Sequence, residues 1–154
     1  YHASFEELSS RHIAGAVLMI DQWKTEKMQA ANLSNHHEMH YQYGLIHEAE
    51  AAKCAIIFSE ELGLKGAVIL IDGKIEGVTL GESMARDTGS ILIEKTNNNF
   101  HGMPQFIYQQ FCENSFPDTS YVNAGEDWGI EGLRRAKTSY HPCMLAKKFL
   151  IYEK

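Results

Sequence analysis

Two stretches in the first 62 residues repeat their apolar positions with the spacing of an α-helix. Residues 4–7 have the S-x-x-E form of a capping box, and from Ile13 the apolar residues recur every three or four positions. We expect this helix to continue to about Ala31. A second apolar stripe covers residues 45–56, with acidic residues on its outer side, and Gly63 is expected to end that helix.

Short apolar runs separated by turns follow, which is the pattern of β-strands. Residues 67–71 are continuously apolar, Asp72 and Gly73 are a strong two-residue hairpin signal, and residues 74–82 resume the strand pattern. Two glycines inside the second run are typical of bulges or of close backbone contact. This stretch therefore predicts an antiparallel pair of strands.

A third strand is predicted after a turn at residues 86–89. It covers residues 90–95, where alternation places Ile91 and Ile93 on one face and Glu94 on the other. With the preceding hairpin it gives three adjacent antiparallel strands. The two N-terminal helices should pack on this sheet, because their apolar stripes have no other large surface to cover.

The remaining elements are shorter. A polar loop at residues 97–102 precedes a helix that ends before Pro117. Residues 121–122 are interpreted as the end of a buried strand. Residues 144–152 contain β-favouring aromatic and branched side chains and are interpreted as a closing strand.

Between those two strands lies a glycine-rich turn followed by a basic helix. Asp127 is placed to cap a helix that begins near Ile130. Within the helix, Leu133 and Tyr140 fall on one face and Lys137 on the opposite, polar face. Acidic residues at the start and basic residues at the end suit the helix dipole, so a well-capped structural helix explains the stretch as simply as chemistry does.

The composition fits one globular domain. The 154 residues are 44% hydrophobic, which is enough for a core. The net charge of -6 argues against a general nucleic-acid-binding protein, which needs clustered Lys and Arg. No apolar run approaches about eighteen residues and no charged-then-apolar leader opens the chain, so we expect no membrane span, no signal peptide and a cytoplasmic location.

Cysteines and histidines provide weaker signals. Cys54, Cys112 and Cys143 are too few and too widely spaced for a disulfide framework or a zinc knuckle, and their apolar neighbours favour packing over a nucleophilic role. His36 and His40 have the spacing of zinc ligands, but the Glu of the zinc-protease motif does not follow His36. Solvated histidines and adventitious metal binding both stay open there, and no metal site is assigned.

Spaced polar residues in the second half of the chain resemble a known family. The matching positions are Asn123, the turn at 125–129, Gly132, Leu133, Arg134, Lys137, Tyr140 and Pro142, preceded by Glu94, Lys95, Gly102, Gln105 and Phe111. From about residue 45 to the end, the chain resembles the C-terminal domain family of phosphatidylglycerol lysyltransferases. The resemblance implies a GNAT-like acyl-CoA N-acyltransferase fold of the α/β (α+β) class, related to the Fem aminoacyl transferases, with a mostly antiparallel mixed sheet flanked by helices.

Members of that family are often longer and contain two GNAT-like halves. Because the sequence begins with Tyr1 and not Met, we expect residues 1–154 to be a single GNAT-like domain, the C-terminal half of a tandem protein whose N-terminal half is its partner. GNAT folds open their sheet between two neighbouring strands. The resemblance implies that the strands ending at Lys95 and Asn123 are these neighbours and splay apart.

Three residues are candidates for catalysis of acyl transfer, which needs a proton acceptor and groups that stabilise the developing anion. Glu94 at a strand end and Asp127 at the next strand's turn are placed to accept a proton, although a solvated carboxylate and a helix cap are the plainer interpretations. Lys137 resembles the lysine that Fem-type transferases associate with the aminoacyl-tRNA ester end. Its plainer interpretation is a solvated charge.

Two further sets complete the candidate site. The residues expected to bind the cofactor or donor are Lys95, His101, Gly102 and Gln105. The residues expected to bind the substrate are Asn123, Glu126, Arg134 and Tyr140, of which the tyrosine also suits core packing. The loop at 97–102 has one glycine and no arginine, unlike the usual acetyltransferase loop, so acyl-CoA and aminoacyl-tRNA compete as co-substrate and no tightly bound cofactor is expected.

Two functions remain open. The first is an acyl or aminoacyl transferase domain acting on an amine or hydroxyl acceptor, with residues 94–102 and 123–140 as the two walls of a cleft. The second is a non-catalytic binding or interface half of a tandem GNAT protein. The acidic chain and the altered loop favour the second.

Overall fold

The computed structural model describes residues 2–31, 38–147, 149 and 151–153, without the side chains of residues 31–40. The chain divides into two compact units, Tyr1–Asn123 and Ala124–Lys154. The first unit holds the sheet. Among the described residues, no helix combines the length and the apolar character needed to cross a bilayer.

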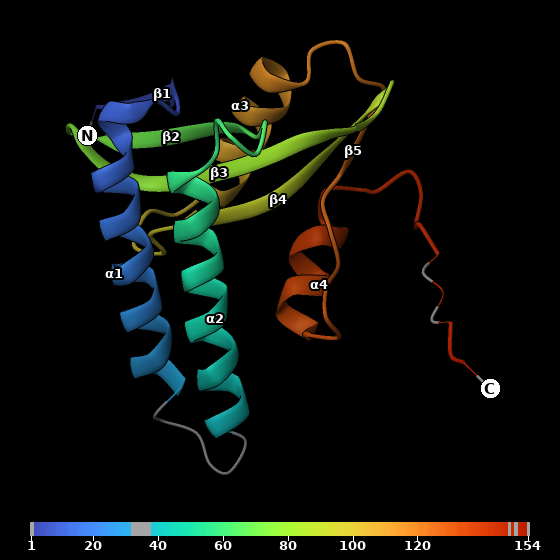
Figure 1. Ribbon diagram of the computed structural model, residues 1–154, viewed down its shortest axis with the longest axis horizontal. Helices are drawn as coiled ribbons and strands as arrows, with labels where there is room; N and C mark the ends of the chain where they lie inside the picture. Colours follow the sequence, from blue (N-terminus) through green and yellow to red (C-terminus); the bar gives the residue numbers. More distant parts are fainter. Residues whose placement is uncertain (1, 32–37, 148, 150, 154) are drawn as a thin grey trace. The chain divides into compact units, whose positions relative to one another are not determined.

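The strands of the first unit form one mixed sheet in the order β1-β2-β3-β4-β5 (Figure 1). They are β1 (Ala3–Glu7), β2 (Lys65–Ile71), β3 (Lys74–Ala85), β4 (Thr88–Thr96) and β5 (Tyr121–Asn123). Neighbours from β1 to β4 are antiparallel, and β5 is parallel to β4. The predicted three antiparallel strands are confirmed, as part of a larger, mostly antiparallel sheet.

Helices cover both faces of this sheet (Figure 1). Val68 of β2 packs against α1 (Ile13–Ala31) and α2 (Glu38–Ile57), whereas its neighbour Ile69 packs against α3 (Met103–Ser115). The cluster buried under α1 and α2 contains Ala16, Met19, Ile20, Trp23, Leu45, Ala49, Ala52, Ile56, Val68, Val78 and Leu80. The prediction that both N-terminal helices pack on the sheet is confirmed.

The first residues form β1 and not the start of the helix that their S-x-x-E pattern predicts. The capping box lies further on, where the Ser9 N–H donates to Nδ1 of His12 (3.1 Å) beside the short 3-10 helix η1 (Ser10–His12), which leads into α1. Pairing with β2 outweighs a local pattern that either structure can accommodate. The predicted helix end at Ala31 is confirmed.

The second predicted helix is confirmed as α2, which starts earlier than its apolar stripe and ends at Ile57, six residues before the Gly63 that was predicted to end it. After it, Gly63 has a φ of 66°, a left-handed value that favours glycine, and the chain turns toward β2. The side chains of His36 and His40 lie outside the described residues. Within the described part, no group of three or more His, Cys, Asp and Glu residues is arranged to hold a metal ion.

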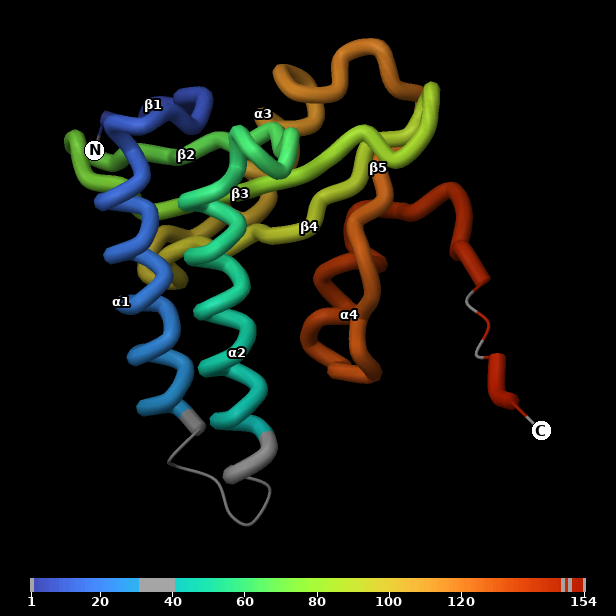
Figure 2. The backbone as a smooth tube through the Cα atoms, in the orientation of Figure 1, coloured from blue at the N-terminus to red at the C-terminus, as the bar shows by residue number. Residues whose placement is uncertain are grey.

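The hairpin between β2 and β3 forms at the predicted turn (Figure 2). Asp72 and Gly73 have φ values of 50° and 82°, as a two-residue type I′ turn requires. Gly81 lies at a register shift between β3 and β4, and a Cβ there would be 2.3 Å from the Ser90 carbonyl oxygen. The interpretation of this glycine as a site of bulging and close backbone contact is confirmed.

The strand β5 is exposed and not buried as the sequence suggested. Its Tyr121 side chain is 47% exposed, Asn123 is exposed, and Val122 is only partly buried. As the last strand in the sheet order, β5 has a paired neighbour on one side only. A three-residue strand with two apolar residues does not reveal from sequence whether it lies in the middle or at the edge.

The second unit contains α4 (Glu131–Thr138), which begins where the sequence predicts. Its N-cap residue is Ile130, and no side chain caps the helix there. The prediction that Asp127 caps α4 is therefore wrong. Its carboxylate instead accepts hydrogen bonds from the Gly129 N–H and from Arg134.

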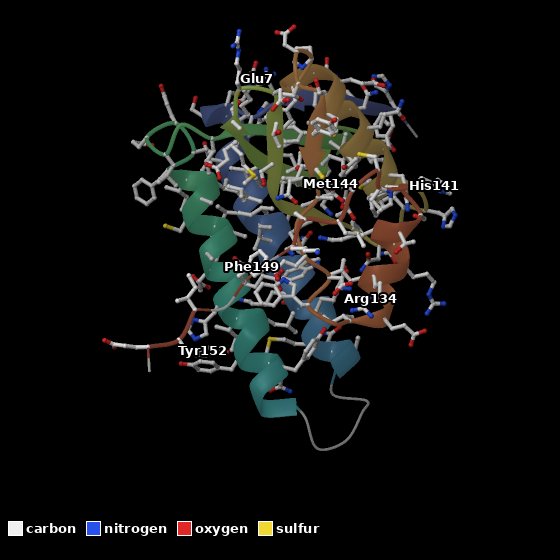
Figure 3. All side chains as sticks on the ribbon, turned by 90° about the vertical axis from the view of Figure 1, so that its right-hand side faces the viewer. Glu7, Arg134, His141, Met144, Phe149 and Tyr152 are labelled. Carbon is white, nitrogen blue, oxygen red and sulfur yellow. The ribbon has the colours of Figure 1, made fainter. Side chains whose placement is uncertain are left out.

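The closing strand predicted for residues 144–152 is also wrong. The described residues of this segment form neither helix nor strand. A strand needs a neighbour to take its backbone hydrogen bonds, and the described part of the second unit contains no strand. Its apolar side chains are exposed, among them Met144, Phe149 and Tyr152 (Figure 3).

Candidate functional site

The ladder between β4 and β5 is short. Its pairs are Thr88 with Tyr121, Gly89 with Val122 and Ser90 with Asn123. There β5 ends, whereas β4 continues to Thr96 and remains paired with β3 on its other side. Residues 91–96 of β4 therefore pair with β3 on one side, and no strand of the described residues pairs with their other side. The prediction that the strands ending at Lys95 and Asn123 are neighbours is confirmed. That they splay apart to open a cleft stays a prediction, because β5 is paired along its whole length and ends there.

A bulge in β4 decides which way its side chains point. Leu80 pairs with Ile93 and Gly81 with Ile91, so Leu92 is an extra residue in the ladder. Ile91 packs in the cluster under α3, and Ile93 packs against the cluster under α1 and α2. The prediction that these two isoleucines share a face is wrong, because a bulge inverts the alternation beyond it.

Beyond the bulge, Lys95 points to the side of the sheet covered by α1 and α2. Its ammonium lies 4.4 Å from the centre of the Trp23 ring and forms an ion pair with Glu48 of α2. The side chain is only 14% exposed. Lys95 thus joins both helices to β4 through a cation–π contact and an ion pair. Its role in donor binding stays a prediction.

Glu94 precedes Lys95 and lies on the α3 side. One of its carboxylate oxygens, Oε2, is shielded from solvent. Burial raises the pKa of the Cys112 thiol on α3 to about 11, and the charge of Glu94 adds to this rise. The thiol is protonated at neutral pH, which excludes Cys112 as a nucleophile. Glu94 is therefore a partly buried carboxylate and not a fully solvated strand end.

The cysteines are all free thiols. Cys54 and Cys143 are exposed, so the prediction that they are packed among apolar neighbours is wrong for both. An open hollow of about 400 Å³ lies beside Cys112, between the end of α3 and the start of β5. It is lined by Cys112, Glu113, Phe116, Pro117, Thr119, Ser120, Tyr121 and Val122. None of the predicted catalytic, cofactor-binding or substrate-binding residues lines this hollow.

The loop before α3 brings three predicted donor-binding residues together. His101, Gly102 and Gln105 are all exposed at the start of the helix. Gly102 is the N-cap residue with a φ of 81°, and the Phe106 N–H donates to its carbonyl oxygen at 3.0 Å. Backbone N–H groups at a helix start favour anions, which is the physical basis of the prediction.

In the second unit, Asp127 organises the turn before α4. Its Oδ1 accepts the Gly129 N–H at 2.8 Å, and its Oδ2 accepts Nε of Arg134 at 2.6 Å. These hydrogen bonds, the one from Arg134 first, lower the pKa of Asp127 to about 2, with a smaller contribution from the charge of Lys137. The structure thus brings three predicted site residues together: Asp127, Arg134 and Lys137. Arg134 is labelled in Figure 3.

Lys137 does not lie on the polar face of α4 as predicted. It is half-buried together with Leu133 and Tyr140, and its Nζ donates a hydrogen bond to the Ala124 carbonyl oxygen. The contact ties the helix back to the start of the unit. Glu126 is exposed in the same turn.

Asn123 ends β5 in the first unit. Its Nδ2 lies 3.7 Å from the sulfur of Met84.

Sequence reasoning missed one contact, between Trp23 and Lys95, and one exposed residue, Trp128. Nothing in the sequence pairs Trp23 with Lys95, which are far apart in the chain. The position of Trp128 between Asp127 and Gly129, in a glycine-rich turn, was a sequence signal that this side chain is exposed.

Solved structures define the class of the fold. A conserved protein of unknown function from Bacteroides thetaiotaomicron matches with a TM-score of 0.80 and 26% identity over 93% of this chain, which spans 45% of that protein's length. A ribosomal-protein-alanine N-acetyltransferase from Brucella melitensis biovar Abortus matches with a TM-score of 0.65 and 8% identity, covering 99% of this chain and 100% of that one. The fold is thus that of the GNAT acetyltransferases.

The family follows from the sequence model that matches. Residues 2–152 match the model of the phosphatidylglycerol lysyltransferase C-terminal domain, so this chain belongs to that family. The protein AAC(6')-Iy, solved in complex with the bisubstrate analogue CoA-S-monomethyl-acetylneamine, also matches with a TM-score of 0.57 and 11% identity over 100% of this chain and 99% of that one. No curated protein matches the sequence.

Proposed function

We propose that this chain is an acyl or aminoacyl transferase domain. It moves the group from acyl-CoA or aminoacyl-tRNA to an amine or hydroxyl acceptor. The observation that carries the proposal is that β5 ends at Asn123 opposite Ser90 while β4 continues to Thr96, in a chain of this family and fold. The CoA-containing analogue bound to AAC(6')-Iy supports an acyl-CoA donor, and the lysyltransferase family supports an aminoacyl-tRNA donor.

The transfer itself makes one bond and breaks another. A lone pair of the acceptor nitrogen or oxygen attacks the donor carbonyl carbon, and the C–S bond of a thioester or the C–O bond of an aminoacyl ester breaks. The acceptor loses one proton, and the leaving thiolate or ribose oxygen gains one. The protein must therefore hold a proton acceptor and stabilise the oxyanion that forms on the carbonyl oxygen.

We assign the proton acceptor to Glu94. Its carboxylate is partly shielded from solvent, on the part of β4 that extends beyond the last pair with β5, Ser90 with Asn123. Shielding keeps water from competing for the carboxylate, which a solvated strand-end residue does not achieve. The transfer to Glu94 is direct or passes through one water molecule.

In the second unit, we assign the binding of an anionic group of the donor to Arg134 and Lys137. A carboxylate with a pKa of about 2 is a weak base at neutral pH, so Asp127 is better suited to positioning Arg134 than to accepting a proton. Its two contacts hold the guanidinium in one orientation. Arginine and lysine at such positions suit a phosphate or a developing anion.

A second function, a non-catalytic binding half of a larger protein, is favoured by a specific observation. Lys95, predicted to bind the donor, is engaged by Trp23 and Glu48. The loop before α3 then relies on Gly102 and exposed side chains to hold pyrophosphate. The chain also spans less than half of the Bacteroides thetaiotaomicron protein.

A transfer assay separates the two functions. Labelled acyl-CoAs and aminoacyl-tRNAs are offered with amine and hydroxyl acceptors to this chain, to its Glu94→Gln variant and to a Glu82→Gln control on an exposed strand position. We expect transfer by the chain, a loss of about a hundredfold or more in Glu94→Gln, and little change in the control. No transfer from any donor, with retained binding of one, would favour the binding function.

A further inference from the structure

We infer that Trp128 is a stacking platform for the adenine ring of the donor. The inference rests on the proposed function and adds a contact to it, because acyl-CoA and aminoacyl-tRNA both carry an adenine nucleotide. Trp128 belongs to none of the predicted site residues. Its indole is 77% exposed, in contrast to the other tryptophan, Trp23, which is 8% exposed.

The backbone of Trp128 is held in an unfavourable conformation. Its φ is 52°, in the left-handed region, where a bulky side chain is a genuine outlier. Gly129 follows with a φ of 74°. A glycine at both positions would form this turn without strain, so the tryptophan does not serve the turn. Strained residues of this kind persist where the surroundings enforce them and cluster at ligand-binding positions.

The surroundings of Trp128 enforce the conformation. Asp127, the residue before Trp128, accepts a hydrogen bond from the N–H of Gly129, the residue after it. The Asp127 carboxylate also accepts a hydrogen bond from the Arg134 side chain of α4. The Ile130 N–H donates to the Asp127 carbonyl oxygen at 2.9 Å, which closes the turn around Trp128. The indole is thus presented to solvent from a braced backbone, so little ordering is needed when a ligand stacks on it.

The chemistry near the indole suits a nucleotide. A single flat, rigid ring stacks on one base, and base–aromatic stacking tolerates any base because each has a π-face. The Arg134 guanidinium, which is bound to the neighbouring Asp127, has five N–H donors. Asp127 accepts hydrogen bonds from Nε and Nη2, and the Arg134 side chain is 62% exposed. A phosphate can therefore approach the same guanidinium.

The test compares two donor probes on the intact chain and its variants. Coenzyme A and an RNA minihelix ending in CCA are titrated by calorimetry, with a minihelix ending in CC as the control for the terminal adenosine. The variants are Trp128→Gly, Trp128→Phe and, as a matched exposed neighbour, Ile130→Ala. Acrylamide quenching of tryptophan fluorescence reports on Trp128, because Trp23 is buried.

We expect Trp128→Gly to melt at the same or a higher temperature, because glycine relieves the left-handed strain. The same variant should bind the probe about tenfold more weakly or worse. Trp128→Phe should retain part of the affinity and Ile130→Ala all of it. Weakened binding of coenzyme A identifies acyl-CoA as the source of the adenine. Aminoacyl-tRNA is identified as the source if the intact chain binds the CCA minihelix but not the CC minihelix, and if Trp128→Gly weakens binding of the CCA minihelix but not of coenzyme A.

Two results overturn the inference in different ways. If the intact chain binds a probe and Trp128→Gly binds it equally well, the stacking role is wrong while the proposed function stands. If the intact chain binds neither probe, the proposed donors and the stacking role both fall. In a third outcome, phosphatidylglycerol vesicles shift the fluorescence of Trp128 to the blue, and neither probe protects Trp128 from acrylamide. That outcome would mean that Trp128 binds a lipid surface and not a nucleotide.

Discussion

The two units of this chain are stabilised by different physics. In Tyr1–Asn123, helices on both faces of a sheet bury large apolar side chains such as Phe111 and Ile20 completely. In Ala124–Lys154, α4 has no buried residue, and Ile151 is 95% exposed. The contacts that define the second unit are polar ones around Asp127 and Lys137. The second unit is therefore held by a few charge-assisted hydrogen bonds and not by a core.

The charges of the two units differ in the same way. The last 31 residues contain six basic and four acidic residues, whereas the first 123 contain eight basic and sixteen acidic ones. The overall charge of -6 hides this difference. An acidic sheet with a basic C-terminal unit fits binding of a phosphate-bearing donor by the second unit better than the average charge suggests.

The largest expected effect comes from cutting a core side chain of the first unit. Phe111→Ala should lower the free energy of unfolding by about 3–5 kcal/mol, because the ring is fully buried between β4 and α3 and a cavity would remain. Phe149→Ala removes a ring that is 82% exposed and should cost less than about 0.5 kcal/mol. Urea denaturation measures both. Equal costs for the two rings would end the contrast between the units.

A smaller effect tests the close approach of strands β3 and β4. Gly81→Ala places a methyl group 2.3 Å from the Ser90 carbonyl oxygen and should cost about 1–3 kcal/mol. The control is Gly44→Ala in α2, where a Cβ meets no atom within 4 Å, and which should stabilise by about 0.5–1 kcal/mol. Thermal melting of both variants checks the signs. A neutral Gly81→Ala would mean that the bulge relaxes at little cost.

The turn around Asp127 in the second unit should respond to acid. The pKa of Asp127 is held at about 2, below its ordinary value of 3.8, mainly by Arg134. A group whose folded pKa is lowered stabilises the fold above its unfolded pKa and loses this contribution as the pH falls through the folded one. The turn should therefore hold above pH 4 and loosen toward pH 2. A carboxyl NMR titration of Asp127 measures the midpoint.

Two arginine variants decide whether that assignment is right. Arg134→Gln should return the Asp127 midpoint toward 3.8, since the first cause of the shift is removed. Arg135→Gln should leave it in place, because Arg135 pairs with Glu131. A midpoint that moves equally in both variants would mean that general charge, and not the contact, lowers the pKa.

The sequence predicted the sheet and its helices well where local signals decide the structure. The turn at Asp72 and Gly73 and the stripe of α2 are local patterns, and both are confirmed. The failures have non-local causes. The pairing of β1 with β2, the bulge at Leu92 and the missing strand at residues 144–152 each depend on which neighbour is available. No periodicity carries that information.

The candidate site was predictable as a list of residues but not as contacts. The Asp127, Arg134 and Lys137 cluster was found through family resemblance, since charges on a polar turn and helix look solvated by pattern alone. Lys95 lies on β4, and its partners Trp23 and Glu48 lie on α1 and α2. These partners could not be predicted from the sequence, because they depend on how the helices pack on the sheet.

Only a small change in stability is expected for Lys137→Met. The variant loses the hydrogen bond from Nζ to the Ala124 carbonyl oxygen but keeps a long side chain beside Leu133, so the free energy of unfolding should change by only about 0.5 kcal/mol. Transfer or donor binding should fall by about ten- to a hundredfold if its ammonium stabilises a developing anion. Lys27→Met, on α1, should change neither quantity. A Lys137→Met variant with full activity would show that the ammonium serves only the carbonyl of Ala124, and the polar contacts of the second unit would then be structural.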